Sequence, residues 1–144
     1  MENLIVLDSN FILLPFQFKI DYLKEIRENI AGKVTFIVYQ QIIDELRAKE
    51  KRFPDKTRFK KNLEAGIIYL NHNKILYDFI FDDARKEESE TSDHFLIRKC
   101  VSLKSEESRV YLATNDKELR RKANDKKIFS IFMRQKKFID VEGF

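Results

Sequence analysis

The sequence is poor in cysteine, glycine and long apolar runs, and each shortage excludes a class of protein. The single cysteine, Cys100, cannot form an internal disulfide and has no partner for a zinc site. With three glycines there is no GxGxxG or GxxxxGK motif, which argues against a phosphate-cradling nucleotide loop. The longest strongly apolar run, residues 11–16, falls far short of the roughly 20 residues that span a bilayer, and no basic signal region precedes it. We therefore expect a cytoplasmic protein that is neither secreted nor associated with a membrane.

The residues that are abundant indicate one folded domain. Hydrophobic residues make up 43% of the 144, and 13 of them are Phe, so there is enough apolar area for a core despite a charged fraction of 36%. This length suits one domain and is too short for two ordinary ones. We expect a single domain over residues 1–144.

The charge is unevenly distributed along the chain. The net charge is only +4, but residues 117–137 carry nine basic and two acidic side chains, and residues 47–61 carry eight and two. Between them, residues 82–93 carry six acidic and two basic side chains. Basic flanks around an acidic centre suit a metal-dependent nuclease, because cations bind the phosphate backbone and carboxylates bind the metal. Charge runs alone are more typical of a solvated surface than of a binding site.

Apolar patterning predicts strands that alternate with helices. Strands are expected at residues 4–7, 34–39, 75–81, 109–114 and 128–133. Helices are expected at residues 19–30, 40–49, 57–71, 92–103 and 117–123, with Ser92 as an N-cap. This alternation predicts a parallel or mainly parallel sheet that is covered on both faces.

Two acids directly follow predicted strands. Asp8 comes after the first strand and Asp116 after the fourth. Ligands of open α/β sheets bind beyond the carboxyl ends of the strands. If these two strands are neighbours, both carboxylates enter one crevice, where Mg²⁺ or Mn²⁺ would relieve their repulsion. A turn former at Asp8 and a helix N-cap at Asp116 are the structural alternatives.

Two further acids could complete such a site. Glu45 flanks the buried stripe of its helix, and Asp93 begins a helix directly after the acidic segment. Either acid could instead compensate a helix dipole, a role equally open to Asp44. His72 and His94 are expected to be packing or surface residues, although His94 adjoins Asp93 and so remains a candidate for substrate contact.

With these acids aligned, the chain resembles the PIN-domain nucleases over essentially its whole length. Val6-Leu7-Asp8-Ser9-Asn10 is similar to the first motif of that family, Asp44-Glu45-Leu46 to the second, and Thr114-Asn115-Asp116 to the fourth. Asp93 falls where the third acid is expected, without the paired acids often seen there, so Glu90 is an alternative. Residues 11–19 and 113–119 further resemble the branch related to small-subunit rRNA-processing nucleases, with VapC-type toxins as the nearby alternative.

The resemblance implies a fold and a chemistry. The fold is a three-layer α/β/α sandwich around a parallel five-stranded sheet of order 3-2-1-4-5, which places the first and fourth strands side by side. The chemistry is RNA cleavage by metal-activated water. Asp8 and Asp116 would be the primary ligands of Mg²⁺ or Mn²⁺, and Glu45 and Asp93 would complete the shell or orient the water. Asn10, Thr114 and Asn115 would support them by hydrogen bonds.

The leading hypothesis is therefore a metal-dependent endoribonuclease that acts in rRNA processing or as a toxin. A non-catalytic RNA-binding assembly subunit is the alternative, and it predicts lost acids. A phosphoacceptor domain or a haloacid-dehalogenase-type phosphatase would need a second acid close to Asp8, where Asn10 stands instead. The resemblance also implies a homodimer, and an antitoxin or ribosome-assembly factors are further candidate partners. The expected RNA-binding residues are Arg120, Arg121, Lys126, Lys127, Arg134 and Lys136.

Overall fold

A six-stranded sheet forms the centre of the protein. The computed structural model describes residues 1–143, and the strand order is β3-β2-β1-β4-β5-β6. The first five strands are parallel, and β6 is antiparallel to β5. The strands are β1 (Glu2–Leu7), β2 (Lys33–Tyr39), β3 (Asp78–Asp82), β4 (Ser108–Ala113), β5 (Phe129–Arg134) and β6 (Phe138–Glu142).

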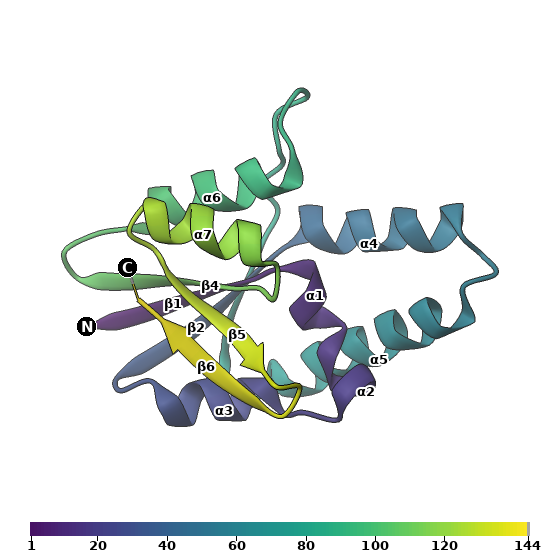
Figure 1. The fold of residues 1–144 in the computed structure, drawn as a ribbon, viewed down its shortest axis with the longest axis horizontal. Coiled ribbons are helices and arrows are strands. Elements are labelled where there is room, and N and C mark those ends of the chain that lie inside the picture. Colours follow the sequence, from purple (N-terminus) through teal and green to yellow (C-terminus); the bar gives the residue numbers. More distant parts are fainter. Residues whose placement is uncertain (144) are drawn as a thin grey trace.

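Helices cover both faces of this sheet (Figure 1). In the view of Figure 1, α6 and α7 lie above the sheet, and α3 lies below it. The helices are α1 (Ser9–Ile12), α2 (Leu14–Phe18), α3 (Tyr22–Asn29), α4 (Gln40–Arg52), α5 (Thr57–Asn73), α6 (Ser92–Leu103) and α7 (Lys117–Asp125). The predicted three-layer α/β/α arrangement is confirmed. No helix within residues 1–143 is both long and apolar enough to cross a membrane.

The register of the central strands brings two distant chain segments together. β1 pairs with β4 from Glu2 opposite Ser108 to Leu7 opposite Ala113. Both strands are almost wholly buried, as expected for parallel strands covered on both faces. The predicted order 3-2-1-4-5 is confirmed, and with it the neighbouring positions of the first and fourth strands. The carboxyl ends of β1 and β4 therefore lie side by side.

The prediction of a five-stranded, wholly parallel sheet was incomplete, because β6 adds an antiparallel edge strand. Its alternating burial, with Ile139 buried between more exposed neighbours, is typical of an edge strand. The turn before it places Gln135 and Lys136 at φ of 54° and 58°. Such turns usually contain Asn or Gly, so this hairpin carries none of the usual sequence signal.

Other predicted boundaries also need correction. The strand expected at residues 75–81 begins only at Asp78, and the helix expected at residues 19–30 begins at Tyr22. Thr91, and not Ser92, caps α6, since the Thr91 hydroxyl accepts a hydrogen bond from the His94 amide at 3.1 Å. The cap position moves by one residue, which frees the Ser92 hydroxyl for another partner.

One glycine marks the closest approach between two helices. Gly66 on α5 lies so near α1 that an added Cβ would be 1.9 Å from the carbonyl oxygen of Ile12. Only a residue without a side chain allows this approach. Because α1 starts directly after Asp8, the contact fixes α5 against the segment that leaves the end of β1.

Candidate active site

Asp8 lies at the carboxyl end of β1 in a buried position. Its side chain is only 8% exposed, and three donors hold its carboxylate. The Ser9 amide donates to Oδ1 at 2.7 Å, and the Thr114 hydroxyl and the Asn10 side-chain amide donate to Oδ2 at 2.8 and 3.1 Å. A carboxylate held by three donors has one fixed orientation. Asp8 also caps the short helix α1, so the alternative of a local structural role is true as well.

The side chains of Asn10, Thr114 and Asn115 join the ends of three strands. The Thr114 hydroxyl also accepts from the Asn10 side chain and from the Asp116 amide, both at 3.1 Å. Asn10 Oδ1 accepts from the Asn115 amide at 3.0 Å, and Asn115 Oδ1 accepts from the Met133 amide of β5 at 2.8 Å. The three residues expected to support the acids are thus one hydrogen-bonded network around Asp8.

Electrostatic coupling links Asp8 to two distant acids. Burial raises the pKa of Asp8, and the bonds from Thr114 and Ser9 oppose that rise. The charges of Asp93 and Asp116 raise the pKa further. Charges raise one another's pKa only when they are near, so the three carboxylates lie in one part of the molecule. The fold therefore brings together acids that are separated by 85 and 108 positions in the sequence.

Asp116 begins α7 at the carboxyl end of β4. Its Oδ1 accepts hydrogen bonds from the amides of Glu118 and Leu119 at 3.0 and 3.1 Å, so it is the N-cap of this helix. The side chain is exposed, and both of these hydrogen bonds are accepted by the same carboxylate oxygen. The N-cap alternative is correct, and it leaves Oδ2 available for a ligand.

Asp93 lies in the first turn of α6, half-buried. No hydrogen-bond donor within residues 1–143 reaches its carboxylate. Burial raises the pKa of Asp93 most, and the charges of Asp116 and Glu45 add to the rise, while Lys122 opposes it. A half-buried carboxylate without a donor is costly, and a bound cation would remove that cost.

Glu90, the alternative third acid, is occupied by other partners. Arg98 binds both of its oxygens, at 2.8 and 2.9 Å, and the Glu87 amide and the His94 ring bind it as well. The Arg98 bonds hold the pKa of Glu90 at about 2. This bidentate ion pair uses the carboxylate that a metal would need. The geometry therefore favours Asp93.

Glu45 faces the other acids from α4. Its Oε2 accepts a hydrogen bond from the Gln41 side chain at 2.8 Å, and its Oε1 accepts one from the Ser92 hydroxyl. The neighbouring Asp44 is directed away, toward Gln40 and Arg85. Sequence reasoning missed Gln41 and Ser92. The i, i+4 spacing of Gln41 and Glu45 was the available signal for one of them.

The chemistry of these four side chains fits a hard divalent cation. All are carboxylates, the ligands that Mg²⁺ and Mn²⁺ prefer, and two of them carry pKa values raised by burial and mutual repulsion. In the arrangement described for residues 1–143, no three acidic, His or Cys side chains are close enough to share one ion. The acids face one region, and a shared ion would have to draw them closer.

The six basic residues expected to bind RNA differ in the partners of their side chains. Arg121 forms ion pairs with Glu118 and Asp125, and Arg134 forms one with Asp140 at 2.6 Å. Arg120 lies over the Phe132 ring at 3.9 Å, and Lys136 lies 6.0 Å from the Phe18 ring. Lys126 and Lys127 are exposed where α7 ends. Only part of this positive charge is thus free of acidic partners.

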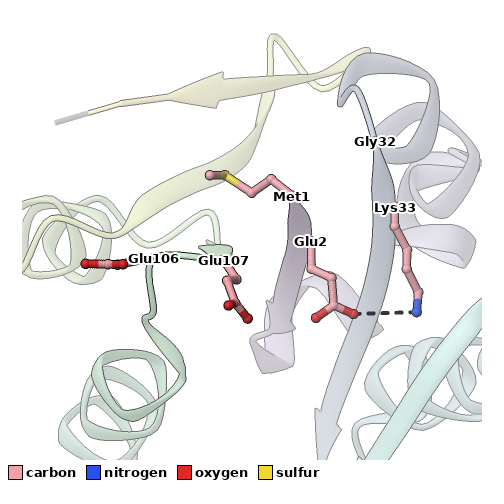
Figure 2. Close-up of a pocket in the computed structure, with 6 residues that line it drawn as sticks. All are labelled: Met1, Glu2, Gly32, Lys33, Glu106 and Glu107. Atoms are coloured by element: carbon pink, nitrogen blue, oxygen red, sulfur yellow. Dashed lines mark ion pairs between the residues drawn. The ribbon is translucent and has the colours of Figure 1, made fainter.

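The cavity shown in Figure 2 lies away from these acids. It is lined by Met1, Glu2, Gly32, Lys33, Glu106 and Glu107, at the amino ends of β1 and β2 and just before β4. The Lys33 ammonium forms an ion pair with Glu2 at 3.5 Å across it. Since ligands of parallel sheets bind at the opposite, carboxyl ends, this cavity is not the candidate site.

The fold agrees with the comparison to known families. The chain belongs to the PIN-domain family of nucleases, whose model matches residues 5–133. Its relatives include Ribonuclease VapC4 of Methanocaldococcus jannaschii, which is 27% identical over 141 residues and covers 96% of each chain.

Two solved structures share the fold. The PIN domain endonuclease Utp24 superposes with a TM-score of 0.68 at 19% identity, over 98% of this chain and 92% of that one. A domain of a functionally unknown protein from Methanocaldococcus jannaschii superposes with a TM-score of 0.61 at 13% identity, over 91% of each chain. These two likenesses bear on the fold alone.

Proposed function

We propose that this protein is a divalent-metal-dependent endoribonuclease with its active site at the carboxyl ends of β1 and β4. The observation that carries the proposal is the buried carboxylate of Asp8, which three donors orient and which is coupled to the charges of Asp93 and Asp116. Burying this carboxylate near two other negative charges costs free energy. Their arrangement is explained by a cation that binds them.

Asp8, Asp93, Asp116 and Glu45 would hold Mg²⁺ or Mn²⁺. When bound, such a cation activates water for attack on the phosphodiester and stabilises the charge that develops on phosphorus oxygens. The chain orients Asp8 through Thr114, and Glu45 or Asp93 completes the ligand set or orients the attacking water. One P–O bond forms, another breaks, and the leaving oxygen takes up a proton.

RNA as the substrate is supported by the relative VapC4, which is a ribonuclease. The role is either rRNA processing or that of a VapC-type toxin, acting on ribosomal, transfer or messenger RNA in the cytoplasm. A homodimer, and an antitoxin or ribosome-assembly factors as partners, follow from the same resemblance. The alternative, a non-catalytic RNA-binding subunit, predicts the loss of metal-binding acids, yet the chain retains all four.

The decisive test compares wild type with Asp8→Asn on single-stranded RNA, with Mg²⁺ and with Mn²⁺. We expect cleavage by wild type, no cleavage in EDTA, and none by the variant, whose circular dichroism should match wild type. Asp83→Asn, in an exposed loop position of the same charge, is the control and should cleave normally. Wild-type cleavage by Asp8→Asn would exclude this residue from the site. An anomalous map from Mn²⁺-soaked crystals would locate the ion directly.

The basic surface can be tested through its salt dependence. Replacing Lys126 and Lys127 with Gln should weaken RNA binding and reduce the slope of log K against log salt, by about 0.7 for each phosphate that the variant no longer neutralises. An unchanged slope would remove Lys126 and Lys127, which follow α7, from the RNA-binding surface.

A further inference from the structure

A cavity of about 260 Å³ opens between α6 and α7, directly beside Asp93. Its lining includes two lysines at the end of α7, Lys122 and Lys126, and two residues of α6, His94 and Ile97. We propose that this cavity is a subsite for one nucleotide of the RNA strand, next to the bond that is cleaved. The inference rests on the proposed function and adds a position for the substrate.

The two lysines are placed to bind one phosphate group. Lys122 and Lys126, the C-cap of α7, are four residues apart, so their ammonium groups project from the same helix face. Neither forms an ion pair within residues 1–143. Like charges at this spacing destabilise a helix. An anion between them would convert this repulsion into two charge-assisted hydrogen bonds.

The acids in the cavity do not oppose a bound phosphate. Asp125 also lines it, but Arg121 pairs with the Asp125 carboxylate at 2.9 Å and compensates its charge. The charge of Lys122 lowers the pKa of Asp93 while those of Asp116 and Glu45 raise it, and a cation held by the acids would compensate Asp93 in place of Lys122. The charge that remains uncompensated in the cavity is therefore that of Lys122 and Lys126.

His94 and Ile97 supply a surface for the base of the same nucleotide. They are three residues apart on one face of α6; Ile97 is 8% exposed, and the His94 side chain is 67% exposed. Glu90 binds Nδ1 of His94 at 2.5 Å, which fixes the ring and leaves Nε2 and the ring faces available. Bases bind protein through stacking on such rings and through apolar contact.

The charge of this cavity distinguishes it from the cavity of Figure 2. Its volume of about 260 Å³ lies near the lower end of the roughly 300–1,000 Å³ range of ligand pockets. The larger cavity of Figure 2 is lined by three glutamates, and its lysine is already paired with one of them. That cavity would repel a phosphate, whereas the one beside Asp93 would attract it.

The first test needs no metal and no catalysis. Adenosine 5′-monophosphate is titrated in EDTA into wild type and into Lys122→Gln/Lys126→Gln, and NMR signals of the His94 ring and the Ile97 methyl groups are followed. We expect saturable shifts of these signals in wild type, and about tenfold weaker binding by the double variant. Lys74→Gln, an exposed lysine outside both basic segments, should bind as wild type does. Shifts elsewhere, or equal binding by the double variant, would overturn the subsite.

The second test measures cleavage of a short RNA by the same variants. The double variant should raise KM about tenfold with little change in kcat. Replacing the phosphate beside the cut with a neutral methylphosphonate linkage should impair cleavage by wild type. The same replacement should have no effect on cleavage by the double variant. If wild type cleaves RNA without the mononucleotide shifts, the subsite is wrong and the proposed function stands. If the shifts occur without cleavage, the proposed function is wrong and the nucleotide site stands.

Discussion

Replacing Thr114 with Val tests the network that orients Asp8. Thr114 is fully buried, and its hydroxyl makes three hydrogen bonds: it donates to Asp8 and accepts from the Asn10 side chain and the Asp116 amide. Valine keeps the shape and removes all three. A hydrogen bond to a charged group contributes about 1.5–3 kcal/mol, and an unsatisfied buried amide costs about 1–3 kcal/mol. We expect the free energy of unfolding to fall by about 3–5 kcal/mol at pH 7.5.

This loss should depend on pH in a defined direction. The Thr114 hydroxyl lowers the pKa of Asp8, so its removal raises that pKa further above the ordinary value. Once Asp8 is protonated in both proteins, the charged part of the interaction is absent from both. The difference in stability between wild type and Thr114→Val is therefore complete at neutral pH, and it shrinks as the pH falls through the folded-state pKa of Asp8.

The assay is urea unfolding at pH 7.5 and at the lowest pH where wild type stays folded. Thr35→Val is the matched control, since Thr35 is the other buried threonine and its hydroxyl forms no hydrogen bond that bears on Asp8. The control should change stability little, and equally at both pH values. Thr114→Ser, which keeps the hydroxyl, should recover most of the lost stability and cleavage. A Thr114→Val variant no less stable than the control would refute the reasoning.

Three further predictions concern Glu45, the titration of Asp8 and the packing of α5. Glu45→Gln should reduce metal-dependent cleavage by one to two orders of magnitude, a range typical of lost ligand support, while Asp44→Asn should cleave as wild type does. Because the pKa of Asp8 is raised and only its ionised form binds metal, cleavage should fall as the pH drops through this raised pKa, and excess Mn²⁺ should move that limb to lower pH. If excess Mn²⁺ leaves the acidic side of the pH profile unchanged, that loss of activity does not come from metal binding by Asp8. Gly66→Ala should lower the unfolding free energy by about 1–3 kcal/mol through its clash with Ile12, measured by thermal unfolding, and a neutral result would mean that α5 can shift.

The sequence sufficed for the parts of the site that follow strands. The apolar run before Asp8 and the segment Thr114-Asn115-Asp116 mark the carboxyl ends of buried strands, and parallel pairing brings such ends together. The hairpin to β6 escaped prediction because its turn uses Gln135 and Lys136 where Asn or Gly is usual. Apolar patterns thus predicted where the buried strands end, and the absence of a usual turn sequence hid the hairpin.

Interactions between separate elements were beyond such patterns. The choice between Asp93 and Glu90 depends on Arg98, which lies eight residues beyond Glu90 and reaches back across the start of α6. The Ser92 hydroxyl bonds Glu45 from 47 positions away, which only the packing of α4 against α6 determines. The sequence positions of the acids cannot show which of them already have partners.

The ion pair between Glu90 and Arg98 limits how much negative charge this end of the sheet presents. Residues 82–93 contain six acids, yet the charge of the buried Glu90 is already compensated by Arg98 of α6. Without the guanidinium, Glu90 would keep only the Glu87 amide and the His94 ring as partners. A single substitution at Arg98 would thereby leave one more uncompensated negative charge just before α6, without altering any of the four acids themselves.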